Sequence, residues 1–208
     1  QQAAGRVRGR PVLSSADRPA DPPRSGRLVV ISGPGGVGKG TVVAELAKRR
    51  PDLVVSVSAT TRARRPGEVD GVHYHFLSDD EFDALIASNS FLEWAEFAGA
   101  RYGTPWSSVH DALAAGATVL LEIDVQGARQ VRARFPDAVL IFLQPPDLEA
   151  LARRMAGRGA DAPERIAERL AIAREEMAAA DSFDHVLVND RLDEAVDAIV
   201  RILDDTPG

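Results

Sequence analysis

One glycine-rich segment, GPGGVGKGT at residues 33–41, constrains the fold of this chain more than any other feature. It follows a short apolar run at 28–32 and precedes a stretch with helical periodicity. In the G-x-x-x-x-G-K pattern the glycines let several backbone N–H groups point into one anion site, at the positive end of the next helix. Lys39 adds a positive charge for the β- and γ-phosphates. The segment therefore predicts a P-loop that binds a nucleoside triphosphate, through Gly33, Pro34, Gly35, Gly36, Val37, Gly38, Lys39, Gly40 and Thr41.

The motif departs from the usual pattern at the position that ligates the metal. A serine or threonine normally follows the lysine and ligates Mg²⁺, but here Gly40 follows Lys39 and Thr41 comes one place later. Thr41 is expected to bind a phosphate, and direct ligation of the metal by its hydroxyl stays open. Asp124 ends an apolar strand, where a parallel sheet delivers side chains to the crevice at its carboxyl edge. We expect Asp124 to hold Mg²⁺ through water; the alternative is that it merely caps the following helix.

Short apolar runs alternate with helical stretches beyond the P-loop. Continuous apolar runs are typical of parallel strands buried on both faces, and the alternation predicts right-handed crossovers. We expect an α/β protein of the P-loop NTPase fold, with a five-stranded parallel sheet flanked by helices, a small mixed α+β insertion and a helical lid. The strands are predicted at 28–32, 53–57, 117–124, 138–143 and 186–188.

Three stretches interrupt this rhythm. Residues 1–26 lack a periodic apolar pattern and are predicted to form a disordered extension. Residues 58–107 hold an arginine-rich loop, a hairpin or extended segment around 72–76, and a helix opened by the capping box of Ser78 and Glu81. Residues 147–180 form two charged helical segments, interpreted as a mobile lid. The remaining segments, 27–57, 108–146 and 181–208, are expected to form the core.

Composition excludes several classes of protein. The net charge of -6 argues against sequence-independent binding of duplex nucleic acid, which needs an extended basic face. Without cysteine there are no disulfides and no thiolate metal sites, so a hard cation such as Mg²⁺ is favoured. No apolar run approaches the roughly 20 residues of a membrane-spanning helix, and the start of the chain lacks a secretory signal. These observations predict a cytoplasmic location and no membrane partner.

Several blocks in one order resemble the guanylate kinase family, over nearly everything from Arg27 onwards. They are GPGGVGKG, SVSATTRARRPGEVDGVHYHF, FLEWAEFAGARYGTP, LEIDVQG, GRG with ERL downstream, and VND. The resemblance implies that the phosphate of GMP meets Arg62, Arg65, Tyr74 and Tyr102. It implies that guanine is read by Ser58, Glu93 and Thr104, and that Asp124 meets both GMP and the metal. It places Arg158 and Arg169 in the lid, with Arg158 also at ATP, and Asn189 near adenine.

Side-chain chemistry supports the resemblance. Two arginines three residues apart can converge on one phosphate, and a tyrosine hydroxyl adds a neutral donor. Guanine offers N1–H and N2–H₂ as donors and O6 as acceptor, so Glu93 can accept from the first pair while Ser58 or Thr104 donates to O6. The alternative for Glu93 is an exposed carboxylate beside Trp94. A site built to bond these groups rejects adenine strongly.

We therefore expect a guanylate kinase that converts ATP and GMP to ADP and GDP by in-line, Mg²⁺-dependent transfer, in purine nucleotide metabolism. GMP and ATP are the expected partners; monomer or homo-oligomer stays open. Because the acceptor phosphate is already anionic, catalysis is expected to come from positioning and charge neutralisation. The residues expected to supply it are Lys39, Arg62, Arg158, Arg169 and Asp124. The alternatives are an inactive family member that binds a peptide, and a P-loop kinase for another nucleotide.

Overall fold

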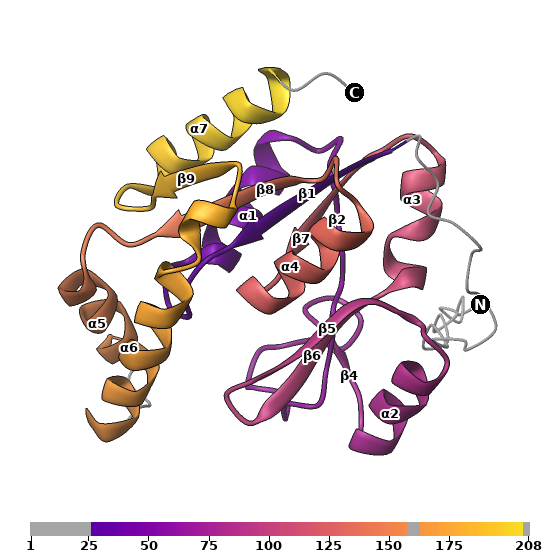
Figure 1. The fold of residues 1–208 in the computed structure, drawn as a ribbon, viewed down its shortest axis with the longest axis horizontal. Coiled ribbons are helices and arrows are strands. Elements are labelled where there is room, and N and C mark those ends of the chain that lie inside the picture. Colours follow the sequence, from indigo (N-terminus) through magenta and orange to yellow (C-terminus); the bar gives the residue numbers. More distant parts are fainter. Residues whose placement is uncertain (1–25, 158–162, 206–208) are drawn as a thin grey trace, which may run out of the picture.

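The chain is described by a computed structural model covering residues 26–157 and 163–205. The predicted extension before Gly26 and the lid residue Arg158 lie outside the described residues. A five-stranded sheet forms the centre of the molecule, and all its neighbouring strands are parallel. Its order is β2 (Val54–Val55), β7 (Thr118–Glu122), β1 (Arg27–Ser32), β8 (Val139–Gln144) and β9 (His185–Val188). The predicted parallel α/β core is confirmed (Figure 1).

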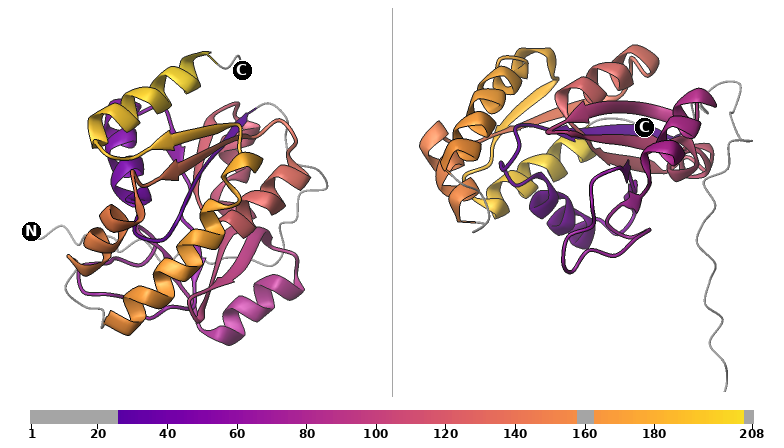
Figure 2. Two further views of the ribbon diagram at one scale, coloured as in Figure 1. Left: turned by 60° about the vertical axis from the view of Figure 1, so that its left-hand side comes forward. Right: turned by 90° about the horizontal axis from the view of Figure 1, so that it is seen from below.

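The three central strands are buried on both faces, as the continuous apolar runs predicted. The same prediction is wrong for the edge strands β2 and β9, since each has an exposed face; Val186 and Val188 of β9 are 41% and 49% exposed. One face packs on α1 (Lys39–Arg49) and α7 (Leu192–Asp205), through residues such as Ile31, Leu46 and Ile199. The other face packs on α3 (His110–Ala114) and α4 (Val125–Arg134), and on the short turns η1 (Trp106–Ser108) and η2 (Ala180–Ser182). Because side chains alternate along a strand, neighbouring residues of each strand serve opposite layers. Figures 1 and 2 show the helices on either side.

A second, mixed sheet is built from residues 58–107. Its order is β4 (His75–Phe76), β3 (Ala59–Thr60), β6 (Ala100–Pro105) and β5 (Phe91–Phe97), with α2 (Asp79–Ala87) packed beside it. Within the segment around 72–76 only β4 is a strand, because residues 71–73 form a turn. The segment does not form a hairpin either, since β4 pairs in parallel with β3. The hairpin of this sheet is β5–β6, which turns at Ala98 (φ 51°) and Gly99 (φ 77°).

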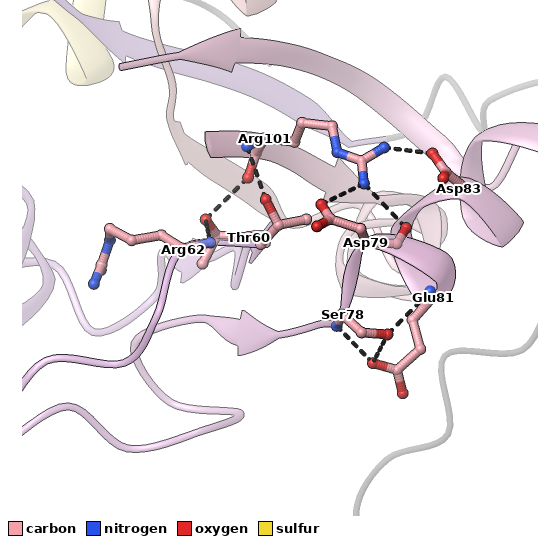
Figure 3. A network of polar contacts seen from close by, with 8 residues as sticks. Thr60, Arg62, Ser78, Asp79, Glu81, Asp83 and Arg101 are labelled. Carbon is pink, nitrogen blue, oxygen red and sulfur yellow. Dashed lines mark hydrogen bonds and ion pairs between the residues drawn. The ribbon is translucent and has the colours of Figure 1, made fainter. Parts of the chain in front are cut away.

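The predicted capping box opens α2. The Ser78 hydroxyl accepts from the backbone N–H of Glu81, and the Glu81 carboxylate accepts from the backbone N–H of Ser78. Arg101 then joins β6 to this helix end. Its guanidinium donates to Asp83 and, at 2.6 Å, to Asp79 (Figure 3). It also lies 4.9 Å from the ring centre of Phe82. Its backbone meanwhile bonds to the start of the arginine-rich loop, since the carbonyl of Arg101 accepts from Thr60.

The outer edge of β5 is covered by side chains of α4. Gln130 bonds to both backbone groups of Trp94: Oε1 accepts from the N–H at 3.2 Å, and Nε2 donates to the carbonyl at 2.6 Å. Arg134 donates to the carbonyl of Phe91 at 2.9 Å and to that of Leu92. Helix α4 thus joins the second sheet to the core.

Two helices, α5 (Leu148–Ala156) and α6 (Pro163–Met177), pack against each other beside the main sheet through Leu151, Met155 and Ala173. Asp147 caps α5, accepting from the N–H of Ala150 at 2.6 Å. Within the described ranges no helix has the length and apolar character needed to cross a membrane.

Candidate functional site

The glycine-rich segment forms a tight turn between β1 and α1. Gly33 has φ 140°, and a Cβ there would lie 2.1 Å from the carbonyl oxygen of Leu143. Gly38 caps α1 with φ 101°, and a Cβ there would lie 2.9 Å from Nδ2 of Asn189. Both positions require glycine, because a side chain would meet a left-handed backbone and a neighbouring atom at once. The backbone N–H groups at the start of α1 are therefore available to an anion.

Lys39 is bound by the turn itself. Its Nζ donates to the carbonyl of Gly33 at 2.6 Å and to that of Pro34 at 3.4 Å. The next two residues, Gly40 and Thr41, are exposed. The ammonium group lies on a flexible stem, so it can exchange these carbonyls for a phosphate.

A cavity of about 900 Å³, counting its open mouth, lies between the P-loop, the second sheet and α6. It brings together residues that are far apart in the sequence and that were predicted to contact different substrates. Those residues are Gly35, Lys39, Ser58, Arg65, Tyr74, Glu93, Tyr102 and Asp124. The other described residues in its wall are Ala95, Phe97, Gly103, Glu122, Ile123 and Glu176.

Glu93 lines this cavity and is only 3% exposed, so its interpretation as an exposed carboxylate is wrong. It faces Thr104 across the β5–β6 ladder, and the fully buried Thr104 hydroxyl donates to its Oε1 at 2.6 Å. Ser58 Oγ lies 3.5 Å from Thr104 Oγ1. Burial raises the pKa of Glu93 to about 7, although the Thr104 hydrogen bond opposes the shift.

Gly127 lets helix α4 approach this carboxylate closely. A Cβ at Gly127 would lie 2.4 Å from Oε2 of Glu93 and 3.4 Å from Oδ1 of Asp124. The backbone N–H of Gly127 donates to Asp124 at 2.7 Å, so Asp124 caps α4 while it also lines the cavity. The two interpretations of Asp124 are therefore compatible. Burial raises its pKa, and the Gly127 hydrogen bond opposes this.

The arginine-rich loop is held by Glu68. Its carboxylate accepts from Nη2 of Arg62 at 2.7 Å, from Nη1 at 3.1 Å and from the backbone N–H of Arg65 at 2.7 Å. The Arg62 and Glu68 side chains are only 16% and 18% exposed, and this pairing raises the pKa of Arg62 and lowers that of Glu68. Arg62 also lies 5.5 Å from the ring centre of Tyr74. Sequence reasoning did not identify Glu68.

The rings of Tyr74 and Tyr102 meet edge to face, 6.0 Å apart, beneath the loop. Burial raises the pKa of Tyr74 to about 12, so its hydroxyl stays protonated and can donate a hydrogen bond at neutral pH. The cation of Arg65 and the neutral hydroxyls of these two tyrosines all line the cavity, and such donors suit a phosphate.

Two carboxylates in the cavity, Glu122 and Glu176, were missed by sequence reasoning. Glu122 ends β7, and burial raises its pKa while Lys39 opposes the shift. Glu176 comes from α6 and accepts from the backbone N–H of Gly35 at 3.3 Å. Burial raises its pKa as well. In the sequence, Glu122 lies in an apolar run and Glu176 lies among other charged residues of a helix. Only the tertiary fold shows that these two carboxylates line the cavity.

The remaining predicted residues lie at the back of the P-loop or on α6. Buried Asn189 donates from Nδ2 to the carbonyl of Val37 at 2.8 Å, and Arg154 donates to the same carbonyl at 3.2 Å. Arg169 is partly buried on α6. Asn189 therefore stabilises the backbone of the P-loop through its side-chain amide.

Comparisons with known proteins agree with this geometry. A sequence model described as Guanylate kinase matches residues 25–206. Guanylate kinase from Gloeobacter violaceus is 58% identical over 189 residues, covering 91% of this chain and 92% of the relative. That from Thermobifida fusca is 56% identical over 193 residues, covering 93% and 96%. The crystal structure of guanylate kinase from Anaplasma phagocytophilum superposes with a TM-score of 0.73 at 34% identity, covering 88% of this chain and 87% of that one.

Proposed function

Because the chain belongs to the guanylate kinase family, we propose that it transfers the γ-phosphoryl group of ATP to GMP, giving ADP and GDP. The observation that carries this proposal is the shared cavity, which both the P-loop Lys39 and the buried carboxylate of Glu93 line. One end suits the phosphates of a donor, and the other suits the base of an acceptor.

The donor binds at the P-loop. Backbone N–H groups at the start of α1 take the phosphates, and Lys39 leaves the carbonyls of Gly33 and Pro34 to neutralise them. Asn189 holds the carbonyl of Val37 and lies beside adenine. Thr41, at the exposed start of α1, contributes a hydroxyl to the phosphates rather than to the metal.

The base end selects guanine. The single proton of the Thr104 hydroxyl goes to Glu93, so Thr104 orients the carboxylate and leaves Ser58 to donate to O6. Glu93 accepts from N1–H and N2–H₂ of guanine. Adenine has an acceptor at N1 and would leave this buried carboxylate unpaired, which a hydrogen-bonding site rejects by roughly 10⁴.

The acceptor phosphate binds between the base end and the P-loop. Arg65, Tyr74 and Tyr102 donate to it from one wall, and Arg62 joins them from its pairing with Glu68. These donors hold the attacking oxygen toward the donor phosphate, which is the positioning that phosphoryl transfer requires.

The donor set of the cavity fits Mg²⁺, since Asp124 and Glu122 supply hard oxygen atoms beside the phosphate site and the chain has no cysteine. When bound, the ion neutralises charge on the donor phosphates. Asp124, fixed by the N–H of Gly127, is the residue we assign to both the ion and GMP.

Closure completes the site. Residues 147–180 act as the lid, which brings Arg169 and Arg158 to the transferring phosphate, and residues 58–107 act as the GMP-binding part. Phe97 and Glu176 support this arrangement because each part already reaches Gly35 of the P-loop: the Phe97 ring lies 3.6 Å from a Cβ position there, and Glu176 bonds to its N–H. Closure excludes water, so ATP is not simply hydrolysed.

The location we infer is the cytoplasm, where both nucleotides are available, and the partners are these small molecules. The net charge of -6 gives no support to a nucleic-acid or membrane partner. A peptide-binding relative without catalysis is not favoured, because Lys39 is present in an intact P-loop.

The test is a coupled assay of ADP release with GMP, AMP, UMP and IMP as acceptors. We expect GMP to be used with the highest kcat/KM, IMP more weakly because it lacks the 2-amino group, and AMP and UMP at background. Equal use of AMP and GMP would refute the role given to Glu93 and the proposed substrate.

A further inference from the structure

The end of helix α6 contacts the P-loop through one acidic side chain. Glu176 is the last residue but one of α6, and its Oε2 accepts a hydrogen bond from the backbone N–H of Gly35 at 3.3 Å. Gly35 lies in the turn between β1 and α1. In a P-loop the backbone N–H groups of this turn are donors for phosphate oxygens. A carboxylate from α6 therefore occupies a donor that suits a phosphate.

The neighbouring groups place this contact beside the phosphates of the donor nucleotide. Lys39 donates to the carbonyls of Gly33 and Pro34, the two residues that precede Gly35. In a P-loop the lysine reaches the β- and γ-phosphates. Glu176 lines the same cavity as Lys39. Burial raises the pKa of Glu176, and the positive charge of Lys39 opposes the shift.

The charge of the cavity favours release of this carboxylate when phosphates arrive. Among the described residues of the cavity wall, carboxylates outnumber cations by four to two. The carboxylates are Glu93, Glu122, Asp124 and Glu176, and the cations are Lys39 and Arg65. The phosphates of a nucleotide add further negative charge, so they repel a carboxylate beside them.

Glu176 is the carboxylate of this group that can move away most easily. Glu122 belongs to the central strand β7, and Asp124 accepts from the N–H of Gly127 at 2.7 Å. Glu176 lies at the end of a helix, and its hydrogen bond of 3.3 Å is longer than the usual distance of about 2.9 Å. A phosphate can therefore replace it at the N–H of Gly35.

We propose that Glu176 competes with a phosphate of the donor nucleotide for the N–H of Gly35, so that the donor binds as the end of α6 leaves the P-loop. This inference rests on the proposed function, because it takes the P-loop to bind a nucleoside triphosphate. A carboxylate offers the negative charge and the acceptor oxygens of a phosphate, which is why one N–H suits both. The competition lowers the affinity of the protein for the donor.

The experiment measures the affinity for Mg²⁺ and AMPPNP, a non-hydrolysable ATP analogue, by calorimetry. Glu176→Gln keeps the length of the side chain and removes its charge. Glu176→Asp keeps the charge but is one methylene shorter, so the carboxylate no longer reaches the N–H of Gly35. We expect both variants to bind AMPPNP about 5-fold more tightly than the wild type, because the competing hydrogen bond is weakened or lost.

Glu175→Gln is the matched control. Glu175 precedes Glu176 on α6, is exposed and is not among the described residues that line the cavity. Removing its charge changes the net charge of the protein as Glu176→Gln does. We expect this control to bind AMPPNP as the wild type does.

Two outcomes would overturn the inference. If Glu176→Gln binds AMPPNP no more tightly than the wild type, the contact with Gly35 does not compete with the donor. If only Glu176→Gln gains affinity and Glu176→Asp matches the wild type, the charge of residue 176 acts through space and the bond to Gly35 plays no part. Either result can coincide with normal GMP phosphorylation by the wild type, whereas failure of the wild type to bind AMPPNP or to use GMP would instead refute the proposed function.

Discussion

Adding one methyl group at Gly127 should change the activity of the protein much more than its stability. It lies in the first turn of α4, with the Glu93 carboxylate against its Cα. In Gly127→Ala the new Cβ would lie 2.4 Å from Oε2 of Glu93, whereas a relaxed contact between carbon and oxygen needs about 3.4 Å. The carboxylate must therefore retreat by about 1 Å, because it is the end of a side chain while Gly127 is fixed in the helix.

Such a retreat disrupts the base site. The 2.6 Å hydrogen bond from Thr104 to Glu93 would stretch beyond bonding distance or force Thr104 to turn. A misplacement of about 1 Å at a reacting complex costs roughly 100-fold, or about 2.7 kcal/mol of transition-state stabilisation. We expect kcat/KM for GMP to fall by about this factor in steady-state assays, with KM for ATP unchanged.

Stability should change much less than activity. Alanine is favoured over glycine inside a helix by up to about 1 kcal/mol, which offsets part of the roughly 1.5–3 kcal/mol lost with the buried Thr104–Glu93 hydrogen bond, so the thermal midpoint of Gly127→Ala should fall by only a few degrees. The matched control is Ala133→Gly, at an exposed position of the same helix, which should lower the midpoint and leave kcat/KM intact. If Gly127→Ala keeps kcat/KM for GMP within threefold of the wild type, Glu93 is not held against α4 as described.

Four further predictions concern residues of the second sheet and its loops. Glu68→Gln should raise KM for GMP about 10-fold and leave KM for ATP unchanged, because it weakens the charge-assisted hydrogen bonds that position Arg62. In an Arg62→Ala background the same substitution should have no effect on KM for GMP. An equal rise in that background would refute the positioning role of Glu68. GMP affinity should increase from pH 6 to pH 8, because Glu93 ionises with a pKa of about 7 and only the anion accepts hydrogen bonds from both guanine donors. Calorimetry of Glu93→Gln should show only the smaller pH dependence that comes from titration of the GMP phosphate. Identical pH profiles for the two proteins would contradict this prediction. The contribution of Glu93 to the free energy of unfolding changes with pH in the opposite direction to GMP affinity. It is fully present below the ordinary pKa of 4.5 and is lost as pH rises through about 7. Arg101→Ala should lower the thermal midpoint of unfolding by a few degrees. It removes partly exposed ion pairs with α2 and a contact with Phe82, which together contribute about 1 kcal/mol to stability. An unchanged midpoint in calorimetric scans would show that these contacts contribute nothing.

Features set by local sequence were predictable. The turn at residues 33–41 has its strand, glycines and helix in one continuous stretch, and the capping box of Ser78 and Glu81 acts over four residues. The hairpin β5–β6 was not foreseen as such, because its turn places Ala98 in the left-handed region, where glycine or asparagine is the usual signal.

Features set by the register of distant segments were not predictable. The contact between Glu122 and Gly40 depends on how β7 lies beside β1, and the bond from Glu176 to Gly35 depends on where α6 ends. The cavity gathers residues predicted from motif blocks, yet the burial of Glu93 follows from α4 packing on β5, which no single block contains.

The amide of Gln130 has a consequence for how the second sheet meets other proteins. By bonding to both backbone groups of Trp94 it imitates the neighbour that an outermost strand lacks. The opposite border of that sheet, β4, is two residues long. A strand from another chain would thus find the backbone of Trp94 in β5 already bonded and only two residues of β4 to pair with, which protects the second sheet from edge-to-edge self-association.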